Sequence, residues 1–296
     1  MKIKALFMIS LCIFLFGGCK ASNQEGDKNA GGEKAAQKTH KGLSIKGSDT
    51  MVHLTSSWAE EFMKINIGSE VSVTGGGSGT GIAALINATT DICAASREIN
   101  DKELSLAAAK NLKPQGVAVA LDGIAIIINQ ANPVSFLSQE ELKKIFTGEF
   151  TNWKQLGGPD QAILVLSRES SSGTYVFFQE HVLSKADYTE RAKLLPGTSA
   201  VVQSIATDKW AIGYVGLGFA QKAGKDIKTV AVRKDDKSSA VEPSVETVKA
   251  GLYPIARKLY FYIGEKLSAQ TQQFVDFCLS DKGQAIVQET GYVTIK

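Results

Sequence analysis

The sequence predicts an α/β fold with mainly parallel sheets. From residue 43 onward, short strand-like and helix-like segments alternate along the chain. The 296 residues are 44% hydrophobic and 21% charged, which is ordinary for a globular protein large enough to bury its own core. The net charge of +3 is small, and no basic run interleaved with aromatic residues occurs. These features argue against a nucleic-acid-binding protein.

The N-terminus has the pattern of an export signal over residues 1–18. Two lysines precede an apolar run, Ala5–Phe16, which is shorter than the about 20 residues of a membrane-spanning helix. Two glycines and Cys19 follow, an order similar to a bacterial lipobox, although Phe16 stands where leucine is preferred. We expect Cys19 to be acylated and to anchor the exported chain to the membrane, with simple secretion to the periplasm as the alternative.

Residues 19–42 are rich in Ser, Asn, Gly, Lys and Glu and almost free of apolar side chains. Such a segment cannot bury enough surface to offset the entropy of ordering, so the sequence predicts a flexible tether behind Cys19.

The expected elements of the body follow from hydrophobic spacing and turn signals. Strands are predicted at Leu43–Lys46, Val71–Val73, Gly123–Asn129, Ile163–Leu166 and Leu259–Ile263. Helices are predicted on the stripe Leu54, Trp58, Phe62 and Ile65, from Ile82, from the Ser138–Glu141 capping box, and at 173–183, 270–279 and 283–287. Gly123–Asn129 is apolar throughout, as in a strand buried on both faces.

Only two cysteines, Cys93 and Cys278, lie in the body, both in apolar surroundings. Packing is the expected role for both. A disulfide between them remains open, since sequence alone does not give connectivity.

Three segments place small hydroxyl residues and glycines between a strand and a helix. They are Gly47–Met51, Gly75–Gly81 and Ser167–Thr174, the last containing Arg168. Backbone N–H groups at a helix N-terminus favour an anion, and a guanidinium fits a tetrahedral oxyanion in bidentate fashion. One such turn is common in any protein, but three of them indicate an anion site at the carboxyl ends of the strands.

Enzyme motifs fail on this chain. The glycine cluster fits neither G-x-G-x-x-G nor G-x-S-x-G, because Thr80 takes the position of the last glycine of G-x-S-x-G. The three histidines, His40, His53 and His181, form no metal-ligand spacing and have no evident nucleophile partner. The sequence therefore predicts a binding protein with no cofactor or metal.

At these residues the chain resembles the phosphate-binding proteins of bacterial phosphate ABC importers. The motifs are GSDTM (47–51), GGGSGTGI (75–82), DICAASREI (91–99), LDGIAIIIN (121–129), FTGEFTNW (146–153), SRESSSGTYVFF (167–178) and YPIARKLYFYI (253–263). The resemblance implies a type II periplasmic-binding-protein fold, with two lobes, two hinge crossovers and a ligand cleft between them. Lobe one would hold residues 43–121 and 260–296, and lobe two residues 122–259.

The resemblance also implies the ligand residues. They are expected to be Asp49, Thr50, Met51, Ser78, Ser96, Arg97, Arg168, Ser172, Gly173 and Thr174. Some members accept the proton of phosphate with a carboxylate where this chain has Ala95-Ser96-Arg97. Asp49 is the candidate replacement, with helix capping as its alternative role, and Arg97 would contact the anion or pair with Glu98.

The expected function is capture of inorganic phosphate and its delivery to membrane permease subunits by a monomeric, lipid-anchored protein. A binder of sulfate or molybdate is the nearest alternative, and a secreted phosphate-ester hydrolase or a signalling or adhesion protein are more distant ones. A carboxylate acceptor separates phosphate from sulfate, because only phosphate keeps a proton at neutral pH.

Overall fold

The computed structural model describes residues 42–235 and 237–296. The predicted signal peptide, Cys19 and the predicted tether lie outside the described residues, except for Gly42. None of the described helices is long and apolar enough to cross a membrane.

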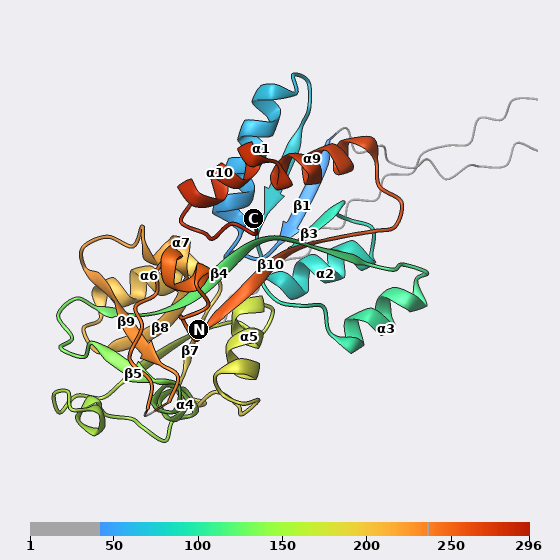
Figure 1. Cartoon of the computed structure of the whole chain (residues 1–296). Coiled ribbons are helices and arrows are strands. Elements are labelled where there is room, and N and C mark those ends of the chain that lie inside the picture. Colours follow the sequence, from blue (N-terminus) through green and yellow to red (C-terminus); the bar gives the residue numbers. More distant parts are fainter. Residues whose placement is uncertain (1–41, 236) are drawn as a thin grey trace, which may run out of the picture. The chain divides into compact units, whose positions relative to one another are not determined.

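The described residues form an α/β structure with strands in the sheet order β2-β1-β3-β10-β4-β8-β6-β7, while β9 pairs with β4 and β5 (Figure 1). The strands are β1 Leu43–Gly47, β2 Val71–Thr74, β3 Ile92–Ala95, β4 Gln115–Asn129, β5 Phe136–Ser138, β6 Leu164–Arg168, β7 Lys193–Leu195, β8 Ala211–Gly216, β9 Ile227–Arg233 and β10 Ala256–Ile263.

Helices pack against strands toward both ends of this sheet and against the central strand β4. They are α1 Val52–Ile65, α2 Ser78–Ile86, α3 Asp101–Ala109, α4 Gln139–Thr147, the 3-10 turn η1 Trp153–Leu156, α5 Gly173–His181, α6 Thr198–Thr207, α7 Leu217–Ala220, α8 Val245–Lys249, α9 Ala269–Leu279 and α10 Asp281–Glu289.

Two long strands, β4 and β10, connect two groups of elements. The first half of β4 pairs with β10, from Gln115↔Ile263 to Gly123↔Ala256. From Ile124 onward β4 pairs instead with β8, and from Ile126 also with β9. Lobe one is the group around β1, β2, β3, α1, α2, α3, α9 and α10, and lobe two is the group around β5 to β9 and α4 to α8. The chain passes between the lobes through β4 and returns through β10.

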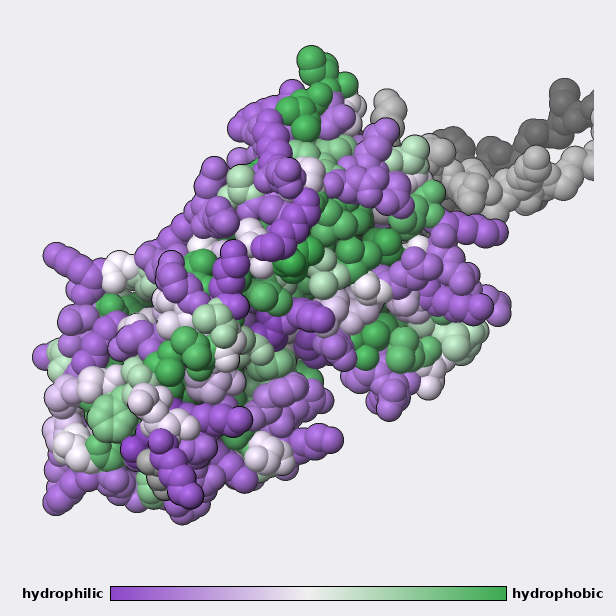
Figure 2. Space-filling model, in the orientation of Figure 1, coloured by the Kyte–Doolittle hydropathy of each residue, from purple (hydrophilic) through white to green (hydrophobic). Residues whose placement is uncertain are grey.

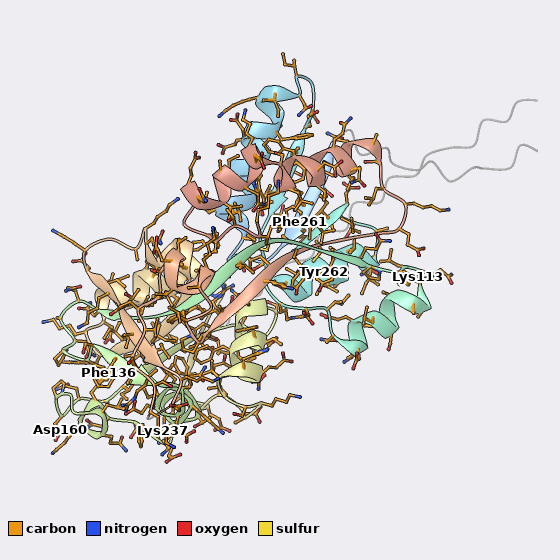
Figure 3. All side chains as sticks on the ribbon, viewed as in Figure 1. Lys113, Phe136, Asp160, Lys237, Phe261 and Tyr262 are labelled. Atoms are coloured by element: carbon orange, nitrogen blue, oxygen red, sulfur yellow. The ribbon has the colours of Figure 1, made fainter. Side chains whose placement is uncertain are left out.

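Each lobe has its own apolar core. In lobe one, Trp58 of α1 packs edge-on against Phe261, with ring centroids 5.6 Å apart, and its Nε1 donates to the carbonyl of Gly283. Phe261 and its neighbour Tyr262 join different clusters, because successive residues of β10 point to opposite faces (Figure 3).

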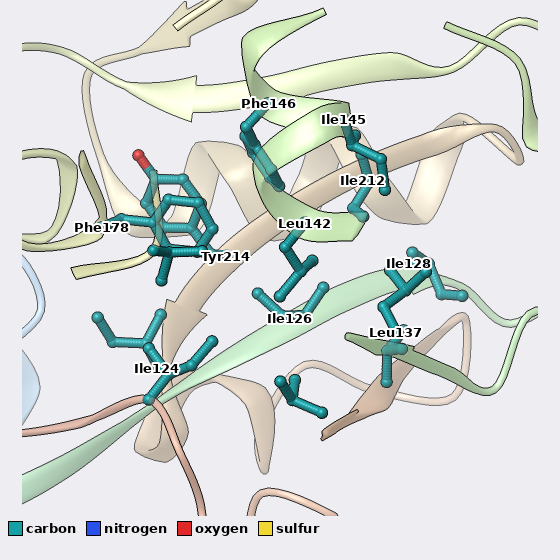
Figure 4. Packing of buried hydrophobic residues seen from close by; sticks show 14 of the residues in the cluster. Ile124, Ile126, Ile128, Leu137, Leu142, Ile145, Phe146, Phe178, Ile212 and Tyr214 are labelled. Carbon is teal, nitrogen blue, oxygen red and sulfur yellow. The ribbon is translucent and has the colours of Figure 1, made fainter. Parts of the chain in front are cut away.

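In lobe two, β4 is buried on both faces, as its unbroken apolar sequence predicts. Ile124, Ile126 and Ile128 face α4 and the Phe178–Tyr214 ring stack (Figure 4). The alternate residues, Ala125 and Ile127, pack into a second cluster on the other face. The structure confirms the predicted strands and helices, including the capping box of α4 at Ser138 and Glu141.

The prediction of mainly parallel sheets is wrong in one respect. Among the named strands, every antiparallel pairing involves β4 or β10, and the other pairings are parallel. A strand that leaves a lobe and a strand that returns to it run in opposite directions, so the hinge itself is antiparallel.

Cys93 and Cys278 are free, buried thiols in separate clusters. Burial raises the pKa of both thiols above the ordinary range. Both cysteines are therefore packing residues in this structure.

Candidate anion-binding site

The three hydroxyl- and glycine-rich loops converge where lobe one meets lobe two. The first follows β1 and leads into α1, the second follows β2 and leads into α2, and the third follows β6 and leads into α5. Thr50 Oγ1 of the first loop lies 2.9 Å from Thr174 Oγ1 of α5. The backbone N–H of Gly79 donates to the carbonyl of Ser171 at 3.0 Å. Both contacts join the two lobes.

Two of the three helices begin without a side-chain cap. The N-cap residues Met51 of α1 and Gly77 of α2 accept no hydrogen bond through a side chain. By contrast, the Ser172 hydroxyl caps α5 by accepting from the N–H groups of Thr174 and Tyr175. The N-termini of α1 and α2 therefore direct the positive ends of their dipoles toward the loops, although the N–H groups of Val52 and Gly79 already donate to backbone carbonyls.

Buried serines form a second group of donors. Ser48 Oγ donates to Ser96 Oγ at 2.8 Å, and Ser78 Oγ lies 3.3 Å from the same atom. The Ser96 N–H donates to Ser78 Oγ at 3.0 Å. All three residues are almost fully buried, so their hydroxyls can exchange partners only with one another or with a buried ligand.

Close backbone approach explains two glycines of the motif. A Cβ at Gly173 would lie 2.2 Å from Ser78 Oγ and 2.7 Å from Ser96 Oγ. A Cβ at Gly77, where φ is +92°, would lie 2.5 Å from the carbonyl oxygen of Ser171. Larger side chains at either position would separate the lobes.

Arg168, at the end of β6, is held from several sides. Its Nε donates to the carbonyl of Leu195, Nη1 to Thr198 Oγ1 at 2.9 Å, and Nη2 to the carbonyl of Pro196 at 2.9 Å. Its Nη2 also donates to Asp49 Oδ2 of lobe one at 2.6 Å. The Arg168 side chain is 3% exposed, so its charge is almost completely removed from water.

Asp49 has two hydrogen-bond partners, and neither is at the start of α1. Its Oδ2 accepts from Arg168, and its Oδ1 accepts from the N–H of Gly76 in the glycine loop at 3.0 Å. The alternative role as a helix cap is therefore wrong, because the turn that follows Asp49 directs its side chain across to the second loop.

Arg97 is held by a different partner from either of those expected. Its two terminal nitrogens bind both oxygens of Glu103 at 2.8 and 2.6 Å, and Nη1 reaches only the backbone carbonyl of Glu98. Glu103 is also the N3 residue of the capping box of α3, which fixes its position. The structure thus places Arg97 in an ion pair beside the loops, and its role as a ligand stays a prediction.

The structure adds a buried ion pair that the sequence reading missed. Arg257 of β10 binds Asp122 Oδ2 of β4 through Nε at 3.2 Å and Nη2 at 2.9 Å. It also donates to Thr174 Oγ1 and to the carbonyl of Ser96. Burial lowers the pKa of Arg257 and raises that of Asp122, and in each the partner's charge opposes the shift. A charged residue inside an apolar strand was the available signal, since such residues are seldom fully buried unless they are paired.

The comparisons with known proteins agree with this geometry. A family model described as PBP superfamily domain matches residues 29–282. The phosphate-binding protein PstS of Staphylococcus haemolyticus is 35% identical over 83% of this chain and 79% of its own length. PstS of Pseudomonas aeruginosa is 32% identical over 86% of this chain and 83% of its own length.

The chain belongs to the PstS family of phosphate-binding proteins. Among solved structures, a substrate-binding protein assigned to phosphate ABC transport in Clostridium perfringens, with bound phosphate, matches with a TM-score of 0.78 at 31% identity. The match covers 86% of this chain and 100% of that one. An ABC-type phosphate transport receptor from Vibrio cholerae matches with a TM-score of 0.68 at 29% identity, over 85% of this chain and 99% of that one. The fold is accordingly the two-lobed type II periplasmic-binding-protein fold.

A cleft of about 600 Å³ opens beside the converging loops. It lies between α5 of lobe two and the start of α3 in lobe one, and β10 forms its floor; Figure 2 shows this face hollowed there. Both Arg97 and Arg257 line it. The remaining surface in Figure 2 is mostly hydrophilic, with small separate apolar patches.

The arrangement offers donors of several kinds around one charged fork. Hydroxyls, helix N-termini and Arg168 all stabilise negative charge. Within residues 42–235 and 237–296, no three or more His, Cys, Asp or Glu side chains lie together as a metal site would need. This donor set is suited to holding a small oxyanion.

Proposed function

We propose that this protein captures inorganic phosphate between its two lobes outside the cytoplasm and delivers it to an ABC permease. The observation that carries the proposal is that loops of both lobes, each preceding a helix, meet in one place: Thr50 contacts Thr174, and Asp49 accepts from Arg168. The relatives named PstS and the phosphate-bound relative support the same ligand.

Affinity comes from many charge-assisted hydrogen bonds in a site with little water. Thr50, Ser78 and Ser96 belong to lobe one, whereas Arg168 and Thr174 belong to lobe two. Only the closed arrangement brings both sets together, so phosphate shifts the lobes toward closure. We assign Met51, Ser172 and Gly173 to the site at the starts of α1 and α5. The N–H groups of Met51 and Ser172 donate here to the carbonyls of Ser48 and Glu169, so they reach the anion only by exchanging these partners.

Asp49 is the proposed acceptor for the phosphate proton. Each of its oxygens already accepts one hydrogen bond, from Gly76 and from Arg168, and each has a second lone pair. Phosphate at neutral pH retains a proton that this carboxylate accepts, whereas fully deprotonated sulfate offers none and is repelled.

Calorimetric titration tests the function directly. Purified protein, stripped of bound phosphate, is titrated with phosphate and then with sulfate, and the same is done for Asp49→Asn. We expect tight phosphate binding without sulfate binding in the wild type, and measurable sulfate binding in Asp49→Asn. A wild-type protein that binds no phosphate would contradict the proposal.

The remaining assignments follow from the sequence and the family. The protein acts as a carrier and not as an enzyme, and it works as a monomer. Lobe one holds residues 43–121 and 260–296, and lobe two holds residues 122–259. The acylated Cys19 holds the protein at the membrane. Mass spectrometry of the mature N-terminus tests the last point, because acylation adds the mass of the lipid to a chain that begins at Cys19. An unmodified mature N-terminus would contradict the lipid anchor and favour simple secretion to the periplasm.

A further inference from the structure

The ion pair between Arg257 and Asp122 lies behind the hydroxyl groups of both lobes. The two residues are direct partners in the antiparallel pairing of β10 with β4, so the strand register places their side chains on one face. The Arg257 side chain is 2% exposed and that of Asp122 is fully buried. This pair lies where β4 passes from β10 to β8, at the crossing between the lobes.

Arg257 contacts both groups of hydroxyls. Its Nη1 donates to the Ser96 carbonyl at 2.8 Å, which fixes the peptide beside the serine group. Its Nη2 donates to Thr174 Oγ1 at 3.0 Å, the atom that faces Thr50 Oγ1. Asp122 holds the guanidinium in place, and its other oxygen accepts from the N–H of Leu217 in lobe two.

The direction of these bonds is fixed by chemistry. A guanidinium has no acceptor, so Thr174 Oγ1 must accept from Arg257. Thr174 and Thr50 together have two hydroxyl hydrogens, and the bond between them uses one. Whichever of the two donates in that bond, one hydrogen remains for a third group. The threonine pair therefore presents a donor toward a ligand, and the nearby guanidinium strengthens that donor by polarising it.

We propose that Arg257, held by Asp122, is a positioning residue that keeps the Thr50–Thr174 pair as a hydrogen-bond donor and thereby selects a deprotonated oxygen of phosphate at this end of the site. The inference rests on the proposed phosphate binding. Asp122 neutralises the charge of Arg257, so the pair fixes the direction of the threonine hydrogen bonds but adds no net electrostatic attraction for the anion. Asp49, at the other end of the proposed site, then accepts a hydrogen bond from the protonated oxygen of phosphate.

The geometry of Arg257 also explains why lysine would be a poor substitute. Three acceptors on separate elements (Asp122, Thr174 and Ser96) are reached by one planar group with several donors in fixed directions. A lysine ammonium keeps the charge but offers no such fork.

The test is a double-mutant cycle with phosphate as the probe. Arg257→Lys, Thr174→Val and the double variant are titrated by calorimetry beside the wild type. We expect each single change to weaken binding roughly tenfold, and the double variant to be little weaker than Thr174→Val alone, because Arg257 acts through Thr174. Losses that multiply would overturn the inference, since they would show that the two residues act independently.

A pH comparison adds a readout that a purely structural role would not change. Arg257→Lys should lose more affinity at about pH 8, where phosphate is mainly the dianion, than at about pH 5.5, where the monoanion brings a second proton. Equal losses at both values would overturn the selection of a deprotonated oxygen. Exposed Arg191→Lys is the matched control and should leave the Kd unchanged.

Two outcomes separate the inference from the proposed function. If the wild type binds no phosphate, the function fails; if it binds and Arg257→Lys binds equally well, only the inference fails. Should Arg257→Lys not fold, the double variant Asp122→Leu with Arg257→Met removes both buried charges at once and tolerates burial better. This double variant should fold and should lose more phosphate affinity at about pH 8 than at about pH 5.5. Unchanged phosphate affinity at both pH values would overturn the proposal.

Discussion

Two arginine–aspartate pairs lie at the candidate site, and they differ in what holds them. Arg257 and Asp122 face each other across two hydrogen-bonded strands, so the backbone ladder fixes their separation. Asp49 lies in a loop of lobe one and Arg168 at the end of strand β6 in lobe two, and Asp49 is 20% exposed. The first pair is part of the hinge and persists however the lobes move. The second exists only while the lobes are together.

This difference assigns separate tasks to similar chemistry. A pair fixed by strand register stabilises the hinge and orients the side chains around it, at the cost of complete burial of both charges. A pair that spans the two lobes stabilises the closed state, and either partner can exchange the other for a ligand. The contrast can be tested by breaking each pair in turn.

The largest effect is expected from Asp122→Ala. It leaves Arg257 buried without its counter-charge, which should lower the free energy of unfolding by about 3–5 kcal/mol. Urea denaturation in the absence of phosphate measures this. Asp49→Ala is the comparison and should cost much less, because Asp49 is 20% exposed and the lobes can separate so that water reaches Arg168. Equal costs would remove the distinction between the two pairs.

Gly173→Ala tests how closely the lobes must approach around these pairs. The added Cβ would meet Ser78 Oγ at 2.2 Å and hold the lobes apart, so phosphate affinity should fall by about 100-fold, or about 2.7 kcal/mol. Calorimetry measures the loss. Gly197→Ala is the matched control, because nothing lies within 4 Å of its added Cβ. Similar losses in both variants would argue that the contact at Ser78 is unimportant.

Asp49→Ala sharpens the role of the cross-lobe pair in closure. Since Asp49 is partly exposed, its loss should cost only about 1 kcal/mol of closure, yet this is enough to shift a balanced equilibrium between open and closed lobes. Small-angle scattering of phosphate-free protein should show a larger radius of gyration than the wild type. An unchanged radius would mean that the pair does not bias closure.

The smallest effect concerns His53 of α1, whose Nε2 contacts Lys222 Nζ just after α7. Burial first, and then Lys222, lowers the pKa of His53 below its ordinary value of 6.5, while Glu60 opposes the shift. The unfolded chain therefore binds a proton before the folded one does. The contribution of His53 to stability is complete above pH 6.5 and is lost as the pH falls below that value toward the lowered pKa.

Solvent screening at this exposed contact keeps the effect to a few tenths of a kcal/mol. Urea midpoints of the wild type and His53→Gln at about pH 7.5 and about pH 5.5 measure it. On acidification the wild type should lose slightly more stability to urea than the variant. An identical loss of stability would assign the pH dependence to other groups.

Hydrophobic spacing predicted the elements that depend on local pattern. The stripe of α1, the capping box of α4 and the apolar second half of β4 were all read from neighbouring residues. The first part of β4, Gln115–Ala120, was missed, because its strand state depends on pairing with β10 more than 100 residues later.

The candidate site was likewise predictable where it depends on residues that are neighbours in the sequence. Loops whose glycines and hydroxyls follow one another in sequence were placed together correctly, as the contacts of Thr50 with Thr174 and of Asp49 with Arg168 show. Arg257 was missed as a site residue, although its motif was recognised, because its partners come from three separate elements. The ion pair of Arg97 with Glu103 was missed, since the sequence does not reveal that Glu103 both caps α3 and turns toward Arg97.

The position of β10 has a consequence for the order in which this chain can fold. Its strand lies between β3 and β4, yet it is the last strand in the sequence. During synthesis, lobe two is complete as soon as its continuous segment has emerged, whereas lobe one must wait for β10, α9 and α10. Domains generally fold as units as their residues become available. The half of the site on β1, β2 and β3 therefore depends on the segment of the chain that is made last, because β10 must pair with β3 before lobe one is complete.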